Sequence, residues 1–340
     1  MTTQELTVNL IHGDHVFAVL ADQWDLLAGK SMTNTPFQCQ AYQGSWWANL
    51  HPENSTLHTI TVSDQDDKLA GIACFYLADG VLYFNGGLEE TDYLDLIVAK
   101  ENAEMVWTAV FDCLCSSEFP EWHGLSLCNI PQASPTRSIV ANIAARRGFS
   151  LSESVAEVCP VIPLPATFDV YLAQIDSKQR REINRKLRRA NGANAQLVQV
   201  QPDDDIEQAV NDFLELLQKS TFEKRDWLNN GRTQLFHDVA KAAQANGTLQ
   251  LLFMEVDGNK AAALFNFEYN GRIWVYNSGL DPQAFGNLSL GVIISAKAIE
   301  LGIENGATEF DFLRGNETYK YRFGASDTTI YRIEIQRNAS

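Results

Sequence analysis

Titratable and aromatic side chains crowd one segment near the end of the chain. Residues 309–324 read Glu-Phe-Asp-Phe-Leu-Arg-Gly-Asn-Glu-Thr-Tyr-Lys-Tyr-Arg-Phe-Gly. The alternation at its start predicts a short strand, and such a concentration of titratable groups at a strand end is typical of a functional site. A structural interpretation also stays open, in which Asp311 pairs with Arg314 and the tyrosines belong to the core.

A loop rich in glycine precedes this segment and faces it if the two strands are neighbours. Residues 277–291 read Asn-Ser-Gly-Leu-Asp-Pro-Gln-Ala-Phe-Gly-Asn-Leu-Ser-Leu-Gly and lead into a predicted helix over 292–305. Glycines and a small polar residue at a helix start can expose backbone N–H groups to an anion, helped by the helix dipole. We therefore expect a pyrophosphate cradle, with a simple helix-capping loop as the alternative.

A second anion-attracting feature is a predicted helix over 177–190. It carries seven cations, Lys178, Arg180, Arg181, Arg185, Lys186, Arg188 and Arg189. Such a block attracts anions, for example the 3′-phosphate of CoA, a nucleotide-sugar or an anionic polysaccharide. The alternative is a solvated helix face. Trp227 further along can stack on a sugar, or pack in the core.

Composition narrows the classes of partner. The net charge is −17; residues 1–158 carry 20 acidic and 6 basic side chains, and residues 159–340 carry 23 and 20. An acidic field repels phosphate backbones, which argues against nucleic acid as the main partner. The six cysteines show neither a disulfide framework nor zinc spacing, so we expect no metal. With no membrane span and no signal peptide in the sequence, we expect a cytoplasmic protein.

A weak internal duplication suggests two similar halves. Asp79-Gly80 and Asn270-Gly271 each join two strand-like runs, and dipeptides of this kind are hairpin signals. Each hairpin leads into a predicted helix and a further strand, which predicts two copies of a mixed α/β unit. The proline-rich segment Cys159–Pro165 marks the boundary, so the predicted domains are 1–158 and 159–340.

The two copies differ where the cradle would lie. In the first half, Leu88-Glu-Glu-Thr-Asp92 replaces the glycine-containing loop and brings three carboxylates to the place of the phosphates. Like charges at a desolvated contact are costly. We therefore predict that only the second half binds a phosphorylated carrier.

The closing segment resembles a known family. Asp311-Phe-Leu-Arg-Gly315 and Tyr319-Lys-Tyr-Arg-Phe-Gly-Ala325 resemble the closing signature of the CelD/BcsL-type GNAT acyltransferases, which occur with bacterial polysaccharide biosynthesis genes and are related to FemAB transferases. Earlier segments resemble the family in the same order: Thr35–Gln38 with Trp46-Trp47, Asp92–Asp95, and Ser177–Arg188. The loop 283–291 departs from the Arg/Gln-x-x-Gly-x-Gly/Ala loop of ordinary GNAT enzymes, which leaves the acyl carrier open.

The resemblance implies a fold of two tandem GNAT-like halves with mixed sheets flanked by helices. It also implies acyl transfer from a thioester to an amine or hydroxyl, with Asp311 or Glu268 taking the acceptor's proton and Tyr319 protonating the thiolate. Acetyl-CoA or another acyl-CoA would be bound by Tyr276, Asn277, Ser278, Gly286, Asn287, Leu288, Ser289, Leu290 and Gly291. Phosphates or the acceptor would be bound by Arg314, Lys320, Arg185, Arg188 and Trp227.

Three functions are compatible with these residues. The first is an acyl-CoA-dependent N- or O-acyltransferase acting on a saccharide or saccharide precursor. The second is a FemAB-like transferase that moves an amino acid from tRNA. The third is a GNAT scaffold without catalysis that binds a partner of polysaccharide synthesis. Neither the acceptor, the acyl length nor the oligomeric state follows from the sequence.

Overall fold

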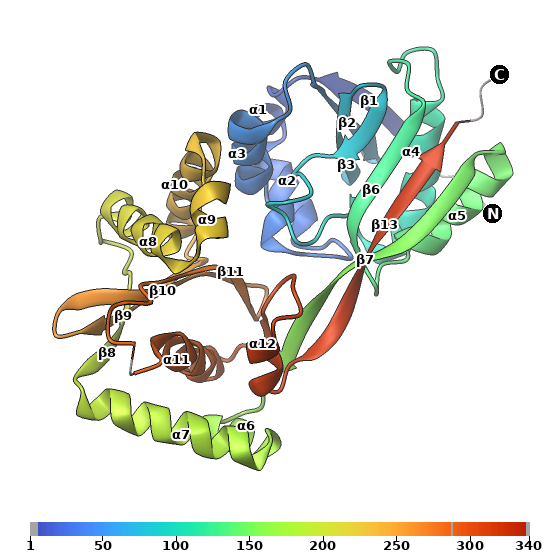
Figure 1. Ribbon diagram of the computed structural model, residues 1–340. Coiled ribbons are helices and arrows are strands. Elements are labelled where there is room, and N and C mark those ends of the chain that lie inside the picture. Colours follow the sequence, from blue (N-terminus) through green and yellow to red (C-terminus); the bar gives the residue numbers. More distant parts are fainter. Residues whose placement is uncertain (1–5, 287, 338–340) are drawn as a thin grey trace. The chain divides into compact units, whose positions relative to one another are not determined.

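The computed structural model describes residues 6–286 and 288–337, which form two compact units (Figure 1). Unit 1 contains the chain up to Glu157 together with the segment from Thr329 onward, and unit 2 is Val158–Thr328. Unit 2 begins at Val158, and the domains 1–158 and 159–340 stay predictions. The C-terminal segment, which we expected in the second half, belongs to unit 1.

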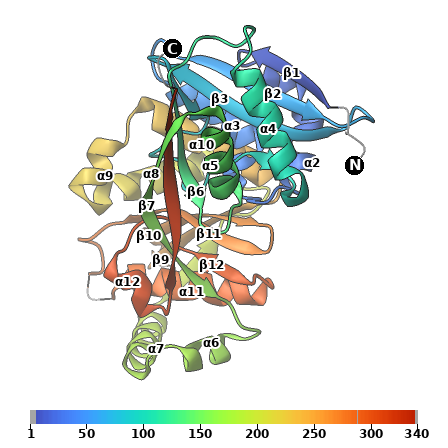
Figure 2. The same cartoon turned by 90° about the vertical axis from the view of Figure 1, so that its right-hand side faces the viewer.

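Unit 1 contains a mixed sheet with the strand order β1-β2-β3-β4-β6-β13, and β5 pairs with β3. Only the pair β4–β6 is parallel; the other pairs are antiparallel. Helix α4 packs on β1, β2 and β3 and also contacts α5 (Figure 2). The elements are β1 Thr7–His12, α1 Val16–Val19, α2 Ala21–Ala28, η1 Pro36–Gln38, α3 Gln40–Leu50, β2 Thr56–Ser63, β3 Leu69–Ala78, β4 Val81–Phe84, β5 Ile97–Val98, η2 Lys100–Asn102, α4 Ala103–Leu114, β6 Gly124–Pro131, α5 Thr136–Arg147, β7 Ser150–Pro163 and β13 Ser326–Gln336.

Unit 2 contains a mixed sheet with the order β7-β12-β11-β10-β9-β8, where β11 and β12 are parallel. Helices α8 and α10 cover one face and α11 the other, with α7 packed on the outer side of α11 (Figure 1). The elements are α6 Phe168–Gln174, α7 Ser177–Gly192, β8 Ala195–Gln199, α8 Ile206–Ser220, α9 Phe222–Trp227, α10 Asn230–Ala245, β9 Leu249–Val256, β10 Asn259–Tyr269, β11 Arg272–Leu280, α11 Leu290–Glu304, β12 Glu309–Asp311 and α12 Thr318–Arg322.

The same succession of elements occurs in both units, as the duplication predicted. In unit 1 a hairpin β3–β4 is followed by α4 and by β6, which is parallel to β4; in unit 2 the hairpin β10–β11 is followed by α11 and by β12, which is parallel to β11. Both hairpin turns have two residues with positive φ, Asp79 and Gly80 at 48° and 75°, Asn270 and Gly271 at 52° and 68°. These angles suit the right-handed twist of the flanking strands, so the short turns fix both registers.

Each unit has its own hydrophobic core, which explains why each is compact. One cluster, around the fully buried Trp107 and Phe75, consists of residues of unit 1, and another, around Phe310 and Ile273, consists of residues of unit 2. Helix α8 buries one apolar stripe, including Phe213 and Leu217. None of the helices formed by the described residues combines the length and apolarity of a membrane span.

A buried histidine gives unit 1 a predictable response to acid. His58 on β2 is 5% exposed, and its Nδ1 lies 2.7 Å from Nδ1 of His12 on β1. Burial, and secondly the charge on His12, lower the pKa of His58 from 6.5 to about 4. Between these values the unfolded chain binds a proton that the folded chain does not, so stability present above pH 6.5 is lost as the pH falls toward 4.

We therefore expect wild-type protein to lose roughly 1–3 kcal/mol more unfolding free energy than His58→Gln when the pH is lowered from about 7 to about 4. Urea unfolding at each pH measures this difference. The exposed His15 supplies the control, since His15→Gln should keep the wild-type pH dependence. Equal pH dependence in wild type and His58→Gln would contradict the assignment.

Candidate active site

Strands β11 and β12 pair over only three residues and then part. Arg272, Ile273 and Trp274 pair with Glu309–Asp311, after which β11 continues to Leu280 while β12 ends. The end of β12 is fixed locally, because Asp311 Oδ1 accepts a hydrogen bond from the N–H of Leu313, 2.7 Å away, and Leu313 has a φ of 56°. Such a φ stops a strand, so an opening forms beside the last residues of β11.

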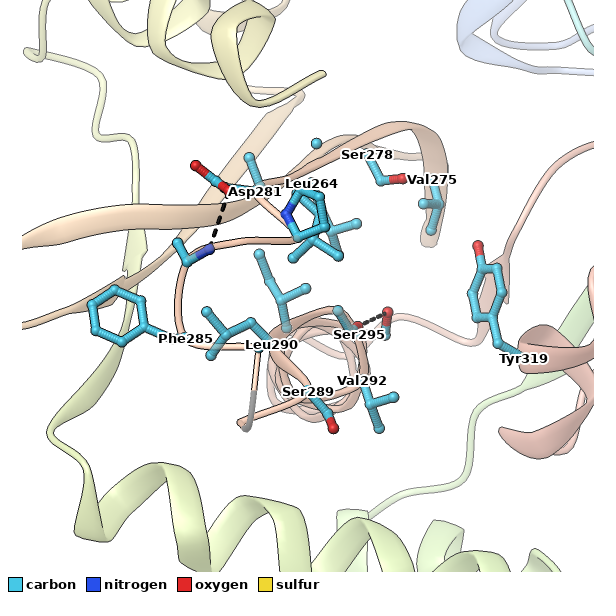
Figure 3. A pocket seen from close by; sticks show the side chains of 18 of the residues that line it. Leu264, Val275, Ser278, Asp281, Phe285, Ser289, Leu290, Val292, Ser295 and Tyr319 are labelled. Atoms are coloured by element: carbon cyan, nitrogen blue, oxygen red, sulfur yellow. Dashed lines mark hydrogen bonds between the residues drawn. The ribbon is translucent and has the colours of Figure 1, made fainter. Parts of the chain in front are cut away.

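A cavity of about 430 Å³ lies at this opening, entirely within unit 2 (Figure 3). Its size is that of a small-molecule site, and its lining is mostly apolar. The β10 and β11 strands, the loop that follows β11, the start of α11, the end of β12 and the residue Tyr319 all contribute. The cavity is lined by Ala263, Leu264, Val275, Ser278, Gly279, Leu280, Asp281, Pro282, Ala284, Phe285, Gly286, Ser289, Leu290, Gly291, Val292, Ile294, Ser295, Phe310, Phe312 and Tyr319.

The start of α11 offers backbone donors at the rim of the cavity. Ser289 precedes the helix with a φ of 60°, and its side chain makes no capping hydrogen bond. The N–H groups of Leu290 and Gly291 have no hydrogen-bond partner within the described ranges. Because α11 has 15 residues, its dipole adds to the attraction of these donors for an anion.

The loop before α11 is shaped by one carboxylate. Asp281 Oδ1 accepts from the N–H of Gln283 at 2.9 Å and of Ala284 at 3.1 Å (Figure 3). These backbone hydrogen bonds lower the pKa of Asp281, which therefore stays ionised. The two hydrogen bonds to the Asp281 carboxylate hold the turn that leads the chain toward Gly286. They thereby fix the backbone conformation of the loop at the rim of the cavity.

Tyr319 is the titratable residue of the predicted cluster that lines the cavity. Its ring stands opposite Val275 and Ser278 across the cavity and packs edge-on against Phe312, with centroids 5.9 Å apart (Figure 3). The side chain remains 39% exposed. Burial of the phenol and, secondly, the Glu317 carboxylate raise the pKa of Tyr319 above its usual range. The phenol is therefore protonated at neutral pH and available as a hydrogen-bond or proton donor.

The other members of the predicted cluster lie outside the cavity lining. Lys320 is 2% exposed, and its Nζ donates to the carbonyl oxygens of residues 313, 314 and 315 and contacts Glu317 Oε2 at 2.9 Å. Asp311 is 3% exposed and forms the turn after β12. Glu268 Oε2 accepts from Gln250 and Asn305 near the far end of β10. Their assigned roles in proton transfer and phosphate binding stay predictions.

The residues proposed to bind the carrier separate into two groups. Ser278, Gly286, Ser289, Leu290 and Gly291 line the cavity together. Leu288 is 4% exposed in the core, and Tyr276 packs among Phe236, Phe265 and Phe267. Asn277 Oδ1 accepts from the N–H of Ser278 at 2.9 Å. Asn287 lies outside the described residues.

The predicted acceptor and phosphate side chains lie elsewhere on unit 2. On α7, Arg185 forms an ion pair with Glu182 at 2.8 Å, and Arg188 Nε donates to the carbonyl oxygen of Asn184 at 3.4 Å. Trp227 packs edge-on against Phe236, and the guanidinium of Arg232 stacks on its ring. None of these side chains, nor Arg314, is among the residues that line the described cavity. Their binding roles stay predictions.

Lys224 is a residue of the site region that our sequence analysis did not select. It lies on α9 and its Nζ donates to the carbonyl oxygen of Ser278 at 2.6 Å, to Ser278 Oγ at 3.1 Å and to Asn277 Oδ1 at 3.0 Å. Burial, opposed by Glu317 and reinforced by Lys320, lowers the pKa of Lys224 to about 8. The ammonium thus holds the end of β11 and brings a positive charge next to the cavity. Lys224 and Ser278 are 54 residues apart, so no local sequence pattern indicated that they would meet.

Gly279 lets helix α8 approach the end of β11 closely. A Cβ atom at this position would lie 2.8 Å from the backbone carbon of Leu216 and from the backbone nitrogen of Leu217. The adjacent N–H of Leu280 donates to Ser220 Oγ at 2.7 Å. The helix and the strand are therefore fixed to each other at the wall of the cavity.

Comparison with known proteins identifies the class of this site. Residues 177–321 match the family model described as an acetyltransferase (GNAT) domain. This range includes Lys224, the glycine-containing loop and Tyr319, and the prediction that the chain is an acyltransferase is confirmed at the level of this class. No curated protein matches the chain significantly.

Similar solved structures extend over both units. FemX has a TM-score of 0.68 at 10% identity and covers 96% of each chain. The L-PGS structure from Bacillus licheniformis has a TM-score of 0.61 at 10% identity, with 94% of this chain and 92% of that one covered. A tandem GNAT protein from the clavulanic acid biosynthesis pathway has a TM-score of 0.51 at 13% identity, with 99% and 100% covered. The predicted fold, two tandem halves with mixed sheets flanked by helices, is confirmed.

The site suits an acyl-CoA, the co-substrate that GNAT domains generally use. The apolar lining fits an acyl group and its thioester arm, and the N–H groups at the start of α11 fit a pyrophosphate. No Lys or Arg lines the described cavity, so the backbone donors and the helix dipole are the features of its rim that attract an anion. Within the described residues no three of His, Cys, Asp and Glu are grouped so that they could hold a metal ion.

We expect Gly279→Ala to destabilise unit 2 by roughly 1–3 kcal/mol, because α8 must move away from β11 to make room for the new methyl group. Denaturant unfolding measures the change. The control is Gly192→Ala at the end of α7, where an added Cβ meets no atom within 4 Å. That variant should be neutral or slightly stabilising. Equal effects of the two substitutions would show that the contact at Gly279 does not fix the cavity wall.

Proposed function

We propose that the chain is an acyl-CoA-dependent N- or O-acyltransferase of the CelD/BcsL type, acting in the cytoplasm on a saccharide or saccharide precursor. The observation that supports the acyl-CoA site is the cavity between the parted strands β11 and β12, with the N–H groups of Leu290 and Gly291, which have no partner among the described residues, at its rim. The support for a saccharide acceptor is the family resemblance of the closing segment.

The proposed reaction transfers an acyl group in one step. The acceptor's amine or hydroxyl attacks the thioester carbonyl, the new C–N or C–O bond forms, and the C–S bond breaks with the electron pair leaving on sulfur. Tyr319 protonates the thiolate, and Asp311 or Glu268, through water, takes the proton of the acceptor. The ammonium of Lys224, which donates to the carbonyl oxygen of Ser278, adds a positive potential at this end of β11 that favours negative charge developing on the thioester oxygen.

The alternative donor is an aminoacyl-tRNA, as the related FemAB transferases use. The likeness to FemX, at 10% identity, supports the fold and not the donor. A cavity without lining cations and a chain of net charge −17 favour the smaller carrier.

Acetyl-CoA should raise the melting temperature of the protein, because it binds only the folded state. A rise with aminoacyl-tRNA alone would favour the alternative, and a rise with neither would favour a scaffold without catalysis.

Ser289 permits a sharp test of the anion cradle. Ser289→Asp adds a carboxylate at the start of α11, which stabilises the helix but repels a pyrophosphate. We expect the Kd for acetyl-CoA, measured by calorimetry, to rise by at least about tenfold with an unchanged or higher melting temperature. Ser289→Asn is the control, since Asn has the same shape without charge and tolerates the φ of 60°. Equal Kd values for the two variants would contradict the cradle.

Tyr319→Phe removes the proton donor while preserving the packing against Phe312. Turnover of acetyl-CoA in the presence of acceptor should fall by about 10²- to 10⁴-fold, whereas the melting temperature should not change. Tyr321→Phe is the control, since Tyr321 donates to Asp327 in the same region and does not line the cavity. Full activity of Tyr319→Phe would return this tyrosine to a packing role.

A further inference from the structure

Unit 1 contains a cavity of its own, of about 440 Å³, which no residue of α4 lines, whereas the start of α11 lines the cavity of unit 2. It lies where the parallel strands β4 and β6 run side by side, and it extends to β3 and β13. Aromatic residues and polar or charged residues together make up half of its lining. The residues are Pro52, Tyr76, Ala78, Tyr83, Phe84, Gly87, Leu88, Leu94, Ser126, Cys128, Arg332 and Glu334.

Four lining side chains form one row across four strands. The register pairs Tyr76 with Tyr83, Tyr83 with Ser126, and Ser126 with Glu334. Neighbours in register point to the same face of a sheet, so this row is a continuous surface. The neighbours along the strands, such as Phe75, Leu82 and Leu125, belong to the hydrophobic core. The row is therefore the face of the sheet that the core does not use.

The two tyrosines form a flat platform at one end of the row. Their rings are stacked with centroids 5.1 Å apart and planes 19° from parallel. Trp46 and Trp47 of α3 pack behind Tyr76, with centroids 5.6 Å and 6.5 Å away. Tyr76 is therefore fixed by its neighbours, and Tyr83, which is only half-buried, presents a ring to the cavity.

Polar groups with unused capacity lie at the other end. Ser126 Oγ donates to Glu334 Oε1 at 2.7 Å, and Arg332 Nε lies 3.9 Å from the same carboxylate. The Nε of Arg332 is buried and has no hydrogen-bond partner within the described part of the chain. A buried guanidinium nitrogen without a partner is costly, which points to a ligand or solvent oxygen as its acceptor.

The charges of this cavity select the ligand. Arg332 and Glu334 compensate each other, so neither a single anion nor a single cation is favoured. Phosphorylated ligands are further disfavoured, because residues 1–158 carry 20 acidic side chains against 6 basic ones. A neutral ring with hydroxyl groups on its edge and C–H groups on its face fits both ends: its hydroxyls pair with an arginine and a carboxylate, and its C–H face stacks on tyrosine.

We propose that the cavity of unit 1 binds a neutral saccharide residue, stacked on Tyr83 and hydrogen-bonded through its hydroxyl groups to Arg332 and Glu334. The site lies within unit 1 and makes no use of an acyl carrier. It therefore stands or falls independently of the reaction proposed for unit 2.

Ligand-observed saturation-transfer NMR of the full chain, without acetyl-CoA, tests the proposal. The probes are methyl β-glucoside and methyl N-acetyl-β-glucosaminide. Two variants alter the cavity in different ways: Tyr83→Leu removes the platform, and Glu334→Gln removes an acceptor while preserving shape. Tyr321→Leu alters a tyrosine of similar exposure outside this cavity and serves as the control. Melting temperatures report whether each variant is folded.

We expect at least one probe to bind, with its Kd raised at least about tenfold by Glu334→Gln and by Tyr83→Leu and unchanged by Tyr321→Leu. If Tyr83→Leu does not fold, Glu334→Gln decides alone. Binding of neither probe with a Kd below about 10 mM would overturn the proposal. So would binding that survives Glu334→Gln, since the saccharide would then lie elsewhere. Displacement of the probe by inorganic phosphate at millimolar concentration would also overturn it, because the cavity would then be an anion site.

Discussion

The parting of two parallel strands is the constraint on which the site in unit 2 depends. Strand β12 ends at Asp311 because Leu313 adopts a left-handed backbone conformation, and β11 continues beyond Trp274 without β12, paired only with β10. A strand that loses its neighbour must satisfy its polar groups elsewhere. Lys224 donates to the carbonyl oxygen of Ser278, and Ser220 accepts from the N–H of Leu280. Helices α8 and α9 thus hold the part of β11 that extends beyond β12, and this support fixes one wall of the cavity.

In our proposals the same succession of elements serves two different ligands in the two units. In unit 2 the cavity has an apolar lining and backbone donors at its rim, which suits a thioester with a phosphorylated tail. In unit 1 the cavity has tyrosines and a compensated Arg332–Glu334 pair. The sequence predicted three carboxylates in the loop after β4, Glu89, Glu90 and Asp92. Of these, Glu90 is 7% exposed and accepts a hydrogen bond from the indole N–H of Trp46 at 3.2 Å. The Glu90 side chain is therefore buried and is not among the residues that line the cavity of unit 1.

Local sequence signals predicted the elements well, because turn chemistry and capping act within a few residues. The Asp-Gly and Asn-Gly turns fixed both hairpins, as predicted, and Asp205 caps α8 by accepting a hydrogen bond from the N–H of Gln208 at 3.1 Å. Features that depend on contacts across the fold had no such signal. Lys224 reaches Ser278 only because α9 packs there, and β13 returns to pair with β6 of unit 1. Lys320 has the charge for a phosphate contact but is surrounded by carbonyl oxygens of its own turn, which a sequence does not reveal.

A crystal structure of the full chain with bound CoA tests the central claim most directly, because each unit offers a cavity of similar volume. Our account predicts the pyrophosphate against the N–H groups of Leu290 and Gly291 and the thiol between β11 and β12, near Tyr319 and Ser278. CoA bound in the cavity of unit 1, against Tyr83 and Arg332, would contradict it.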